Sequence, residues 1–291
     1  MGFLYSQFFK TPLYPTSDFS GKTVIITGSN VGLGKEAARH YARLDASVLI
    51  LAVRSLDKGL VAKQEITRTT GHKNIKVWKL DMSDYTSIQS FVKRAEDELD
   101  RVDVFIANAG VVRSQYHEVN GHEEGIAVNV IATTLLMVNV IRLLGSKLDL
   151  PSQETCEKYW SQQYPVSKLI QLLIVRAIAN RHPANVFPVT VNIVNPGLCW
   201  SELAREATGW GFWLFRLVVA RSAEVSGRTL VHAGAEGIET HEKYLSDCVV
   251  DEPSALVTDA AGKEVQARIM AEVIDAIEVI QPGVSKNFSA V

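Results

Sequence analysis

The chain has 291 residues, of which 47% are hydrophobic and 21% are charged, and its net charge at pH 7 is -2. This length suits one large α/β domain with a substantial core, and the charge balance offers no basic surface for nucleic acid. No apolar run reaches the length of a membrane span. The widely spaced Cys156, Cys199 and Cys248 indicate a reducing compartment, and we expect a cytoplasmic protein. The seven histidines show no paired-ligand spacing, so no metal is predicted.

We predict an N-terminal arm over residues 1–17, which is apolar and aromatic and packs on the domain or on a neighbouring subunit. The remaining residues, 18–291, show no repeat, no low-complexity tract and no domain boundary. They are expected to form a single catalytic domain.

A glycine-rich turn follows the first apolar run of this domain. Residues 24–26 predict a buried strand, Gly28, Gly32 and Gly34 crowd the next turn, and residues 35–44 have the composition of a helix. Glycines let a backbone approach phosphates closely, and a helix N-terminus offers unpaired N–H groups to their charge. The order strand, glycine-rich turn, helix therefore predicts a dinucleotide site, although the spacing Gly-x3-Gly-x-Gly only approximates the general fingerprint. A glycine-rich turn without a ligand is the less favoured alternative.

Strands and helices alternate through the first half of the chain. Further strands are predicted at 46–53, 74–80 and 103–107, and helices at 56–70, 83–99 and 122–147. In the second half we expect helices at 164–181, 224–235 and 260–280, and strands at 189–194 and 243–248. This alternation predicts a doubly wound parallel sheet, whose ligands bind at the carboxyl ends of the strands. Residues 210–220 are an aromatic-rich segment that fits either a lid over the site or an ordinary core helix.

Two polar residues at strand ends bear on the cofactor. Arg54 ends the second strand, where an acidic residue would accept bonds from the ribose of NAD, and its planar donor fork suits the 2′-phosphate of NADP. The position favours NADP(H) over NAD, against the simpler interpretation of a surface arginine. Asp81 ends the third strand, where it could accept from the adenine amino group or cap the next helix.

Tyr164 and Lys168 are four residues apart and share one face of a predicted helix. A nearby cation favours the phenolate, so we expect the pKa of Tyr164 to be lowered from about 10 toward neutrality. Such a tyrosine can exchange a proton with an alkoxide as hydride is transferred. The spacing is weak evidence alone and gains meaning from the nucleotide-binding half before it.

Several motifs occur in a fixed order, namely residues 27–34, Asn108-Ala-Gly110, Asn129 in Ala-Val-Asn-Val, Tyr164-x3-Lys168 and Pro196-Gly197. Together they resemble the motifs of the short-chain dehydrogenase/reductase family. The sequence around them resembles the retinol-dehydrogenase-like branch of that family, especially fungal members of secondary-metabolite pathways. The resemblance implies a single-domain Rossmann-type fold. It also suggests a homo-oligomer, since members of the family commonly form dimers or tetramers.

The same resemblance implies roles for individual residues. Tyr164 would donate or accept the proton, Lys168 would lower its pKa and hold the nicotinamide ribose, and Asn129 would anchor a water in a proton relay. Leu33 and Asn108 would line the cofactor cleft, and Ser201 would stand near the nicotinamide amide.

One departure from the family pattern concerns the interval 145–163. The family places a fifth strand there, ending in a serine that binds the substrate oxygen and stabilises developing charge. Here the interval has no Val/Ile-rich run, and Ser152 follows Pro151, which cannot donate to a central ladder. The fifth strand is therefore expected to be missing or truncated, so that its two neighbours either pair directly, flank a stub or leave the sheet damaged. A splice variant or a faulty gene model would explain the missing segment.

Three functions are consistent with these observations. The favoured one is an NADP-dependent oxidoreductase that acts on the carbonyl or secondary alcohol of a mainly apolar small molecule, a substrate class suggested by Trp210, Phe212, Trp213 and Phe215. The alternative is a nucleotide-binding variant with impaired catalysis, because the serine-bearing strand is missing. A sugar-nucleotide epimerase is disfavoured, since little chain follows Pro196 to build a second domain.

Overall fold

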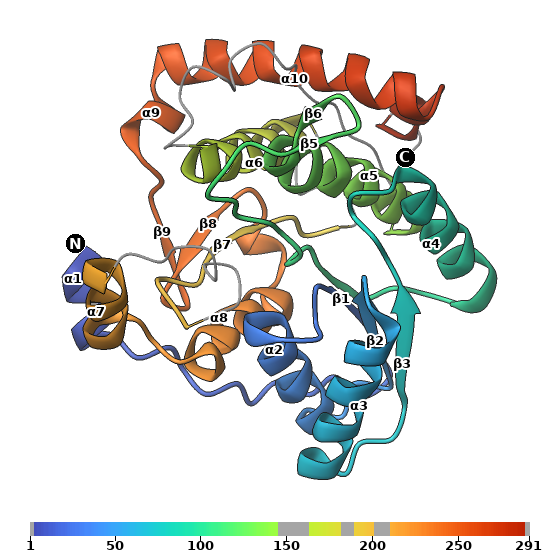
Figure 1. Cartoon of the computed structure of the whole chain (residues 1–291), viewed down its shortest axis with the longest axis vertical. Coiled ribbons are helices and arrows are strands. Elements are labelled where there is room, and N and C mark those ends of the chain that lie inside the picture. The colour runs from blue at the N-terminus through green and yellow to red at the C-terminus, as the bar shows by residue number, and fades with distance from the viewer. Residues whose placement is uncertain (1–2, 145–162, 182–188, 201–209, 289–291) are drawn as a thin grey trace.

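The computed structural model describes residues 3–144, 163–181, 189–200 and 210–288, and Figure 1 follows the chain through them. Its main sheet has four parallel strands in the order β3-β2-β1-β4. These strands are β1 (Thr23–Thr27), β2 (Val48–Val53), β3 (Ile75–Lys79) and β4 (Val104–Ile106). The predicted doubly wound α/β class is confirmed.

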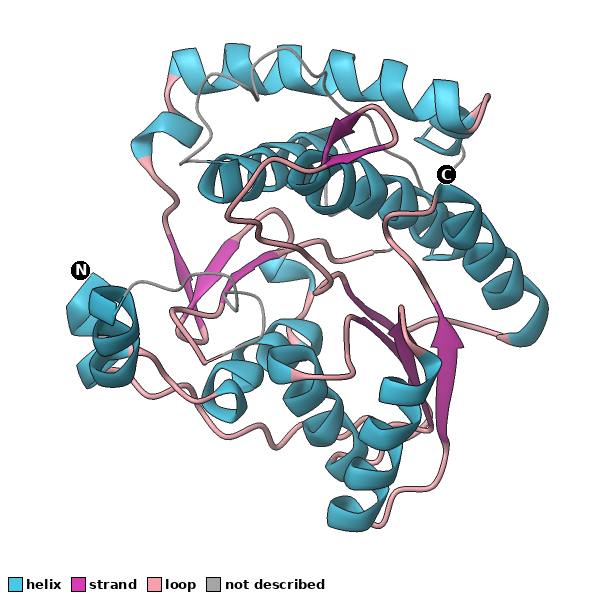
Figure 2. Ribbon diagram, in the orientation of Figure 1, coloured by secondary structure: helices cyan, strands magenta, loops and turns pink. Residues whose placement is uncertain are grey.

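Helices cover both faces of this sheet, as Figure 2 shows in cyan. One face packs against α2 (Gly32–Arg43), α3 (Leu56–Thr70) and α8 (Ala223–Ala235). The other packs against α4 (Tyr85–Glu98), α5 (Thr133–Leu144), α6 (Gln163–Arg181) and α10 (Ala260–Ile280). Alternate residues of β1 serve the two cores, since Ile25 belongs to one cluster and Val24 and Ile26 to the other.

Local signals explain why some helix boundaries agree with the sequence prediction to the residue. The Ser55 hydroxyl caps the start of α3, and Gly71 ends it in the left-handed conformation with φ 78°. Asp259 caps α10 through the N–H of Gly262 at 2.6 Å. For α4 the capping residue is Asp84, which excludes Asp81 as the cap of that helix.

A second sheet contains β7 (Ile193–Asn195), β8 (Tyr244–Ser246) and β9 (Val249–Asp251). Within the described residues, β4 pairs only with β1 and β7 pairs only with β8. The two strands that should flank the fifth strand therefore do not pair with each other there. The interval that would supply that strand, 145–162, lies outside the described residues, and so does Ser152.

The predicted helix over 122–147 is wrong at its start. A short hairpin of β5 (Glu118–Val119) and β6 (His122–Glu123) comes first, with Asn120 and Gly121 at its turn in the left-handed region. Then a π-helix, η1 (Ile126–Ala132), leads into α5. All seven residues of η1 are buried. The apolar pattern marked a buried helix, but burial alone cannot distinguish a π-helical start from an α-helical one.

The N-terminal arm contains a helix that the sequence analysis did not predict, α1 (Phe3–Phe9), which lies beside α7 (Trp210–Val219) in Figure 1. The Gln7 amide donates to the carbonyls of Leu198 and Val219, at 2.9 and 3.1 Å. Arg221 is paired with Asp247 at 2.6 Å, both side chains being buried, and it also donates to the carbonyl of Ser6. These bonds fasten the arm to the rest of the chain.

The remaining helical elements are short ones, η4 (Ile238–Thr240), α9 (Ala255–Thr258) and η5 (Val284–Phe288). No helix in the described ranges has both the length and the apolar character needed to cross a membrane.

Candidate active site

The glycine-rich turn between β1 and α2 is held in place by residues that follow β4. The side-chain amide of Asn108 donates to the carbonyl of Thr27 at 2.8 Å, and the Thr27 hydroxyl accepts from the N–H groups of Asn108 and Ala109 at 3.0 and 2.8 Å. Gly28 has φ 65°, in the region that favours glycine. A Cβ on Gly34 would lie 2.5 Å from Asn108 Nδ2, so this approach also requires glycine.

The first turn of α2 presents its N–H groups without a capping side chain, since Val31 occupies the cap position and makes no side-chain hydrogen bond. Unpaired N–H groups at a helix start attract anions. The turn and the helix start together form a glycine-lined cradle whose unpaired N–H groups suit a pyrophosphate.

A cavity of about 1710 Å³ brings the predicted site together. Every residue predicted to bind cofactor lines it: Gly28, Gly32, Leu33, Gly34, Arg54, Asp81, Asn108, Tyr164 and Lys168. Asn129, predicted as catalytic, is not on the cavity wall and lies fully buried behind it.

Residues that follow β2 and β3 line another part of this cavity. Arg54 is exposed there, and Lys58, in the first turn of α3, lines the same region and was not predicted. Asp81 accepts from the N–H and the hydroxyl of Ser83, at 3.1 and 2.6 Å, so its carboxylate braces the turn before α4. Arg54 and Lys58 thus place positive charge on the cavity wall just after β2.

Tyr164 and Lys168 face the cavity one turn apart on α6, and the Lys168 ammonium lies 5.8 Å from the centre of the Tyr164 ring. Burial raises the pKa of Tyr164 to about 12, with a smaller contribution from the neighbouring Cys199. Burial also lowers the pKa of Lys168 to about 8. The expectation that the pKa of Tyr164 is lowered toward neutrality is therefore wrong for this geometry, because burial disfavours the phenolate.

Asn129 has a precise structural role in η1. Its side chain accepts from the N–H of Val111 at 2.8 Å and donates to the carbonyl of Val111 at 2.9 Å. It also donates to the Ser167 hydroxyl at 3.2 Å, and that hydroxyl donates to the carbonyl of Tyr164. Asn129 thus joins the segment after β4 to the helix that carries Tyr164 and Lys168. Gly110 fits between them, since a Cβ there would lie 3.1 Å from Asn129 Oδ1.

The sequence analysis missed Gln171, the residue that connects this cluster. Its Oε1 accepts from Lys168 Nζ at 2.8 Å, and its Nε2 donates to the main-chain carbonyl of Asn129. The spacing of three residues after Lys168 on a helix was the available signal.

Two expectations about the rest of the site have different outcomes. Ser201 lies outside the described residues. The aromatic segment is the helix α7, but Trp210, Trp213 and Phe215 are exposed, and among the side chains of α7 that the structure describes only Arg216 lines the cavity. These three aromatic side chains form neither a lid over the site nor a core helix.

A glycine cradle at the carboxyl edge of a parallel sheet, with a tyrosine–lysine pair beside it, defines a nucleotide-dependent oxidoreductase. Residues 22–210 match the family model described as short chain dehydrogenase. The chain therefore belongs to the short-chain dehydrogenase/reductase family.

Similar proteins and structures support this assignment. The chain is 47% identical to the short chain dehydrogenase/reductase dmxR8 of Cryptosporiopsis sp., with 99% of this chain and all of the relative covered. It is 37% identical to the short-chain dehydrogenase anuD of Penicillium roqueforti, covering 100% of this chain and 86% of that one. A crystal structure of a short chain dehydrogenase from Burkholderia cenocepacia in complex with NADP has a TM-score of 0.62 at 19% identity, covering 79% of this chain and 97% of that one. That likeness shows the fold.

The alignment with the Cryptosporiopsis relative runs over 324 positions, more than the 291 residues of this chain. That relative therefore has residues with no counterpart here. Neither the family match nor these relatives distinguish the retinol-dehydrogenase-like branch, which stays a prediction.

Proposed function

We propose that this protein is an NADP(H)-dependent oxidoreductase that transfers hydride between the cofactor and a carbonyl or secondary alcohol of a mainly apolar small molecule. The observation that carries the proposal is that Tyr164 and Lys168 line the same cavity as the glycine cradle. Bound in that cradle, the reduced cofactor supplies the hydride.

The chain's own residues would manage the proton. With a pKa of about 12, the Tyr164 hydroxyl is protonated at neutral pH and can donate to the oxygen of a ketone as that oxygen gains negative charge. Lys168, with a pKa of about 8, is mostly protonated at pH 7, and its positive charge stabilises the phenolate left behind. Asn129 and Ser167 hold α6 in register with the rest of the site.

The preference for NADP(H) rests on charge at the far end of the cavity. Arg54 is exposed there and Lys58 lies one helical turn further on, with no acidic residue between β2 and α3 to accept from a ribose hydroxyl. A planar guanidinium and an ammonium together suit a phosphate.

The proposed substrate class is inferred from the apolar side chains of the cavity wall. Trp210, Trp213 and Phe215 of α7 do not support it, because they are exposed and do not line the cavity. Apolar side chains contribute to the cavity wall from several segments, including Val111, Val112, Leu172 and Leu198. We place the reaction in secondary-metabolite biosynthesis, in the cytoplasm, on the resemblance of the motifs and the usage of cysteine. A homo-oligomer is proposed on the same resemblance.

The experiment is NADPH oxidation by the purified protein against a panel of apolar ketones, with Tyr164→Phe as the matched variant. Saturable oxidation that Tyr164→Phe lowers by at least about a thousandfold supports the proposal. NADPH binding without turnover by the native chain contradicts it and leaves a nucleotide-binding protein without this reaction.

A further inference from the structure

The Gln171 side chain bridges two groups of the candidate active site that do not touch each other. It accepts from the Lys168 ammonium at 2.8 Å and donates to the main-chain carbonyl of Asn129. A carboxamide has one accepting and one donating end, so these two bonds fix its orientation. The bridge thus runs in one direction, from ammonium to amide to carbonyl.

The far end of this bridge is rigid. Asn129 is fully buried within η1, and its side chain is held by Val111 and Ser167. Its main-chain carbonyl is consequently a fixed point relative to the segment after β4. Gln171 transmits that fixed position to Lys168, whose long flexible stem would otherwise occupy several rotamers.

We propose that Gln171 is a positioning residue that holds the Lys168 ammonium beside Tyr164 and favours its protonated form. The proposal rests on the proposed reductase function for its catalytic consequence. An amide oxygen that accepts from an ammonium stabilises its charge, so it opposes part of the cost of burial.

Other charged groups near this part of α6 do not explain the state of Lys168. Tyr164 lies on the same helix, Cys199 follows β7, and η1 carries no ionisable side chain. The helix α10 also packs on α6 and carries Lys263, Glu264, Arg268, Glu272, Asp275 and Glu278. Burial accounts for the lowered pKa of Lys168. Gln171 accepts a hydrogen bond from the Lys168 ammonium, so it can offset part of that lowering.

The test compares two variants of nearly the same size, Gln171→Met and Gln171→Glu. Methionine removes both bonds, so the pKa of Lys168 and the high-pH limb of kcat should move down by about one pH unit, and kcat at pH 7 should fall about twofold as about half of Lys168 loses its proton. Glutamate keeps an acceptor and adds negative charge, so the limb should move to higher pH than in the native protein. KM for the ketone should change less than kcat in Gln171→Met, because Gln171 acts through Lys168.

A matched control is Gln281→Met, which removes the two side-chain hydrogen bonds, each 3.2 Å long, between Gln281 and Asn139. It should leave the pH limb in place. If Gln171→Met and Gln171→Glu lower thermal stability while the limb stays where the native protein has it, Gln171 is only structural and the proposal is overturned.

A second readout separates this proposal from the proposed function. The Lys168 side chain can be titrated by NMR with 13C-labelled lysine, its signal being assigned by its loss in Lys168→Met. Opposite shifts of that titration in Gln171→Met and Gln171→Glu support the positioning role even if no ketone is reduced. Identical titrations in all three proteins overturn it, even if the native protein is an active reductase.

Discussion

The ammonium of Lys168 and the ring of Tyr164, 5.8 Å apart on α6, have their pKa values moved in opposite directions by the same burial. Between about pH 8 and about pH 12 the tyrosine keeps its proton while the lysine has lost its own. The positive charge that offsets the phenolate is therefore absent in that interval.

We expect the rate of ketone reduction to be level up to about pH 8 and to fall above it, following the deprotonation of Lys168. The measurement is kcat against pH at saturating NADPH and ketone. A rate that keeps rising to pH 10 would show that neutral Lys168 suffices.

Arg54→Asp should change cofactor choice. Replacing the exposed guanidinium with a carboxylate removes charged hydrogen bonds to a 2′-phosphate, so Kd for NADPH should rise by about 10- to 100-fold while Kd for NADH changes little. Fluorescence titration with both cofactors measures this. Arg94→Asp, at an exposed position of α4 paired with Glu98, is the control and should leave both Kd values unchanged. Equal losses for NADPH and NADH would argue against a 2′-phosphate contact.

Gly34→Ala should damage the cradle. The added Cβ would lie 2.5 Å from Asn108 Nδ2 and 2.9 Å from the carbonyl of Gly28, so the glycine-rich turn must move. Overpacking of this kind destabilises by about 1–3 kcal/mol. Thermal unfolding and NADPH titration should both show a loss. Gly211→Ala on α7 is the control, since a Cβ there meets nothing within 4 Å. Unchanged NADPH affinity in Gly34→Ala would contradict this account of the cradle.

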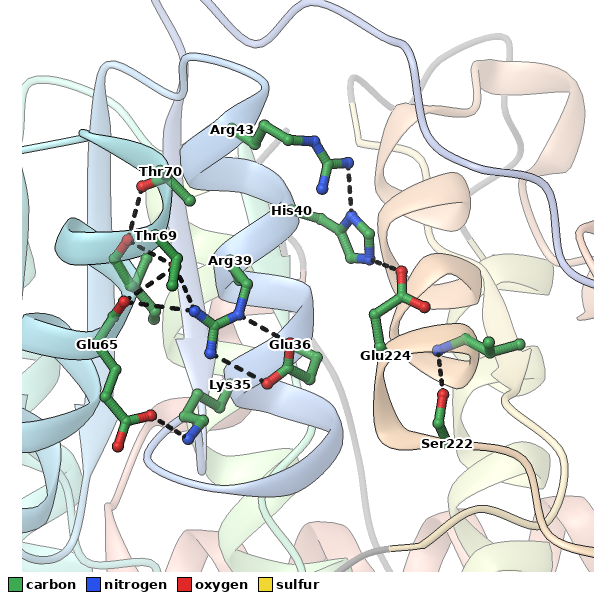
Figure 3. A network of polar contacts seen from close by, with 12 residues as sticks. Lys35, Glu36, Arg39, His40, Arg43, Glu65, Thr69, Thr70, Ser222 and Glu224 are labelled. Atoms are coloured by element: carbon green, nitrogen blue, oxygen red, sulfur yellow. Dashed lines mark hydrogen bonds and ion pairs between the residues drawn. The ribbon is translucent and has the colours of Figure 1, made fainter.

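His40 should make the stability of the fold depend on pH. Figure 3 shows it between Arg43, which donates to its Nδ1 at 2.7 Å, and Glu224, whose Oε1 lies 3.0 Å from its Nε2. Burial, followed by the charge of Arg43, lowers the pKa of His40 below its usual 6.5. Below about pH 6.5 the unfolded chain takes up a proton that the folded chain resists, so stability present above that pH is lost as the pH falls.

The free energy of unfolding should therefore decrease from pH 7 to pH 5.5, as measured by urea denaturation. His40→Gln should flatten this decrease, whereas His117→Gln, at an exposed position, should not. The same slope in His40→Gln and in the native protein would assign the pH dependence to other groups.

The sequence predicts most of the α/β framework because its signals are local. Unbroken apolar runs give β1 and β2, and capping residues such as Ser55, Gly71 and Asp259 set helix ends before any tertiary contact is known. The candidate site follows from the same logic, since its motifs stand at strand ends that meet at one edge.

Features that depend on tertiary contacts were missed or mistaken. The π-helical start of η1 and the link from Gln171 to Asn129 arise from packing between segments distant in the chain. The pKa of Tyr164 moved opposite to expectation because helix spacing reveals a neighbouring cation but not the extent of burial. The outward orientation of Trp210 and Trp213 was likewise invisible in an apolar pattern.

The most direct test of the central claim is a single-turnover reaction with NADPH that carries deuterium at both C4 positions of the nicotinamide, and an apolar ketone that the protein binds. The account predicts an alcohol one mass unit heavier than that formed with unlabelled NADPH, with the deuterium on the former carbonyl carbon. It also predicts that this product is absent with Tyr164→Phe on the same time scale. An unlabelled alcohol, or labelled product formed equally fast by Tyr164→Phe, would contradict hydride transfer assisted by this tyrosine.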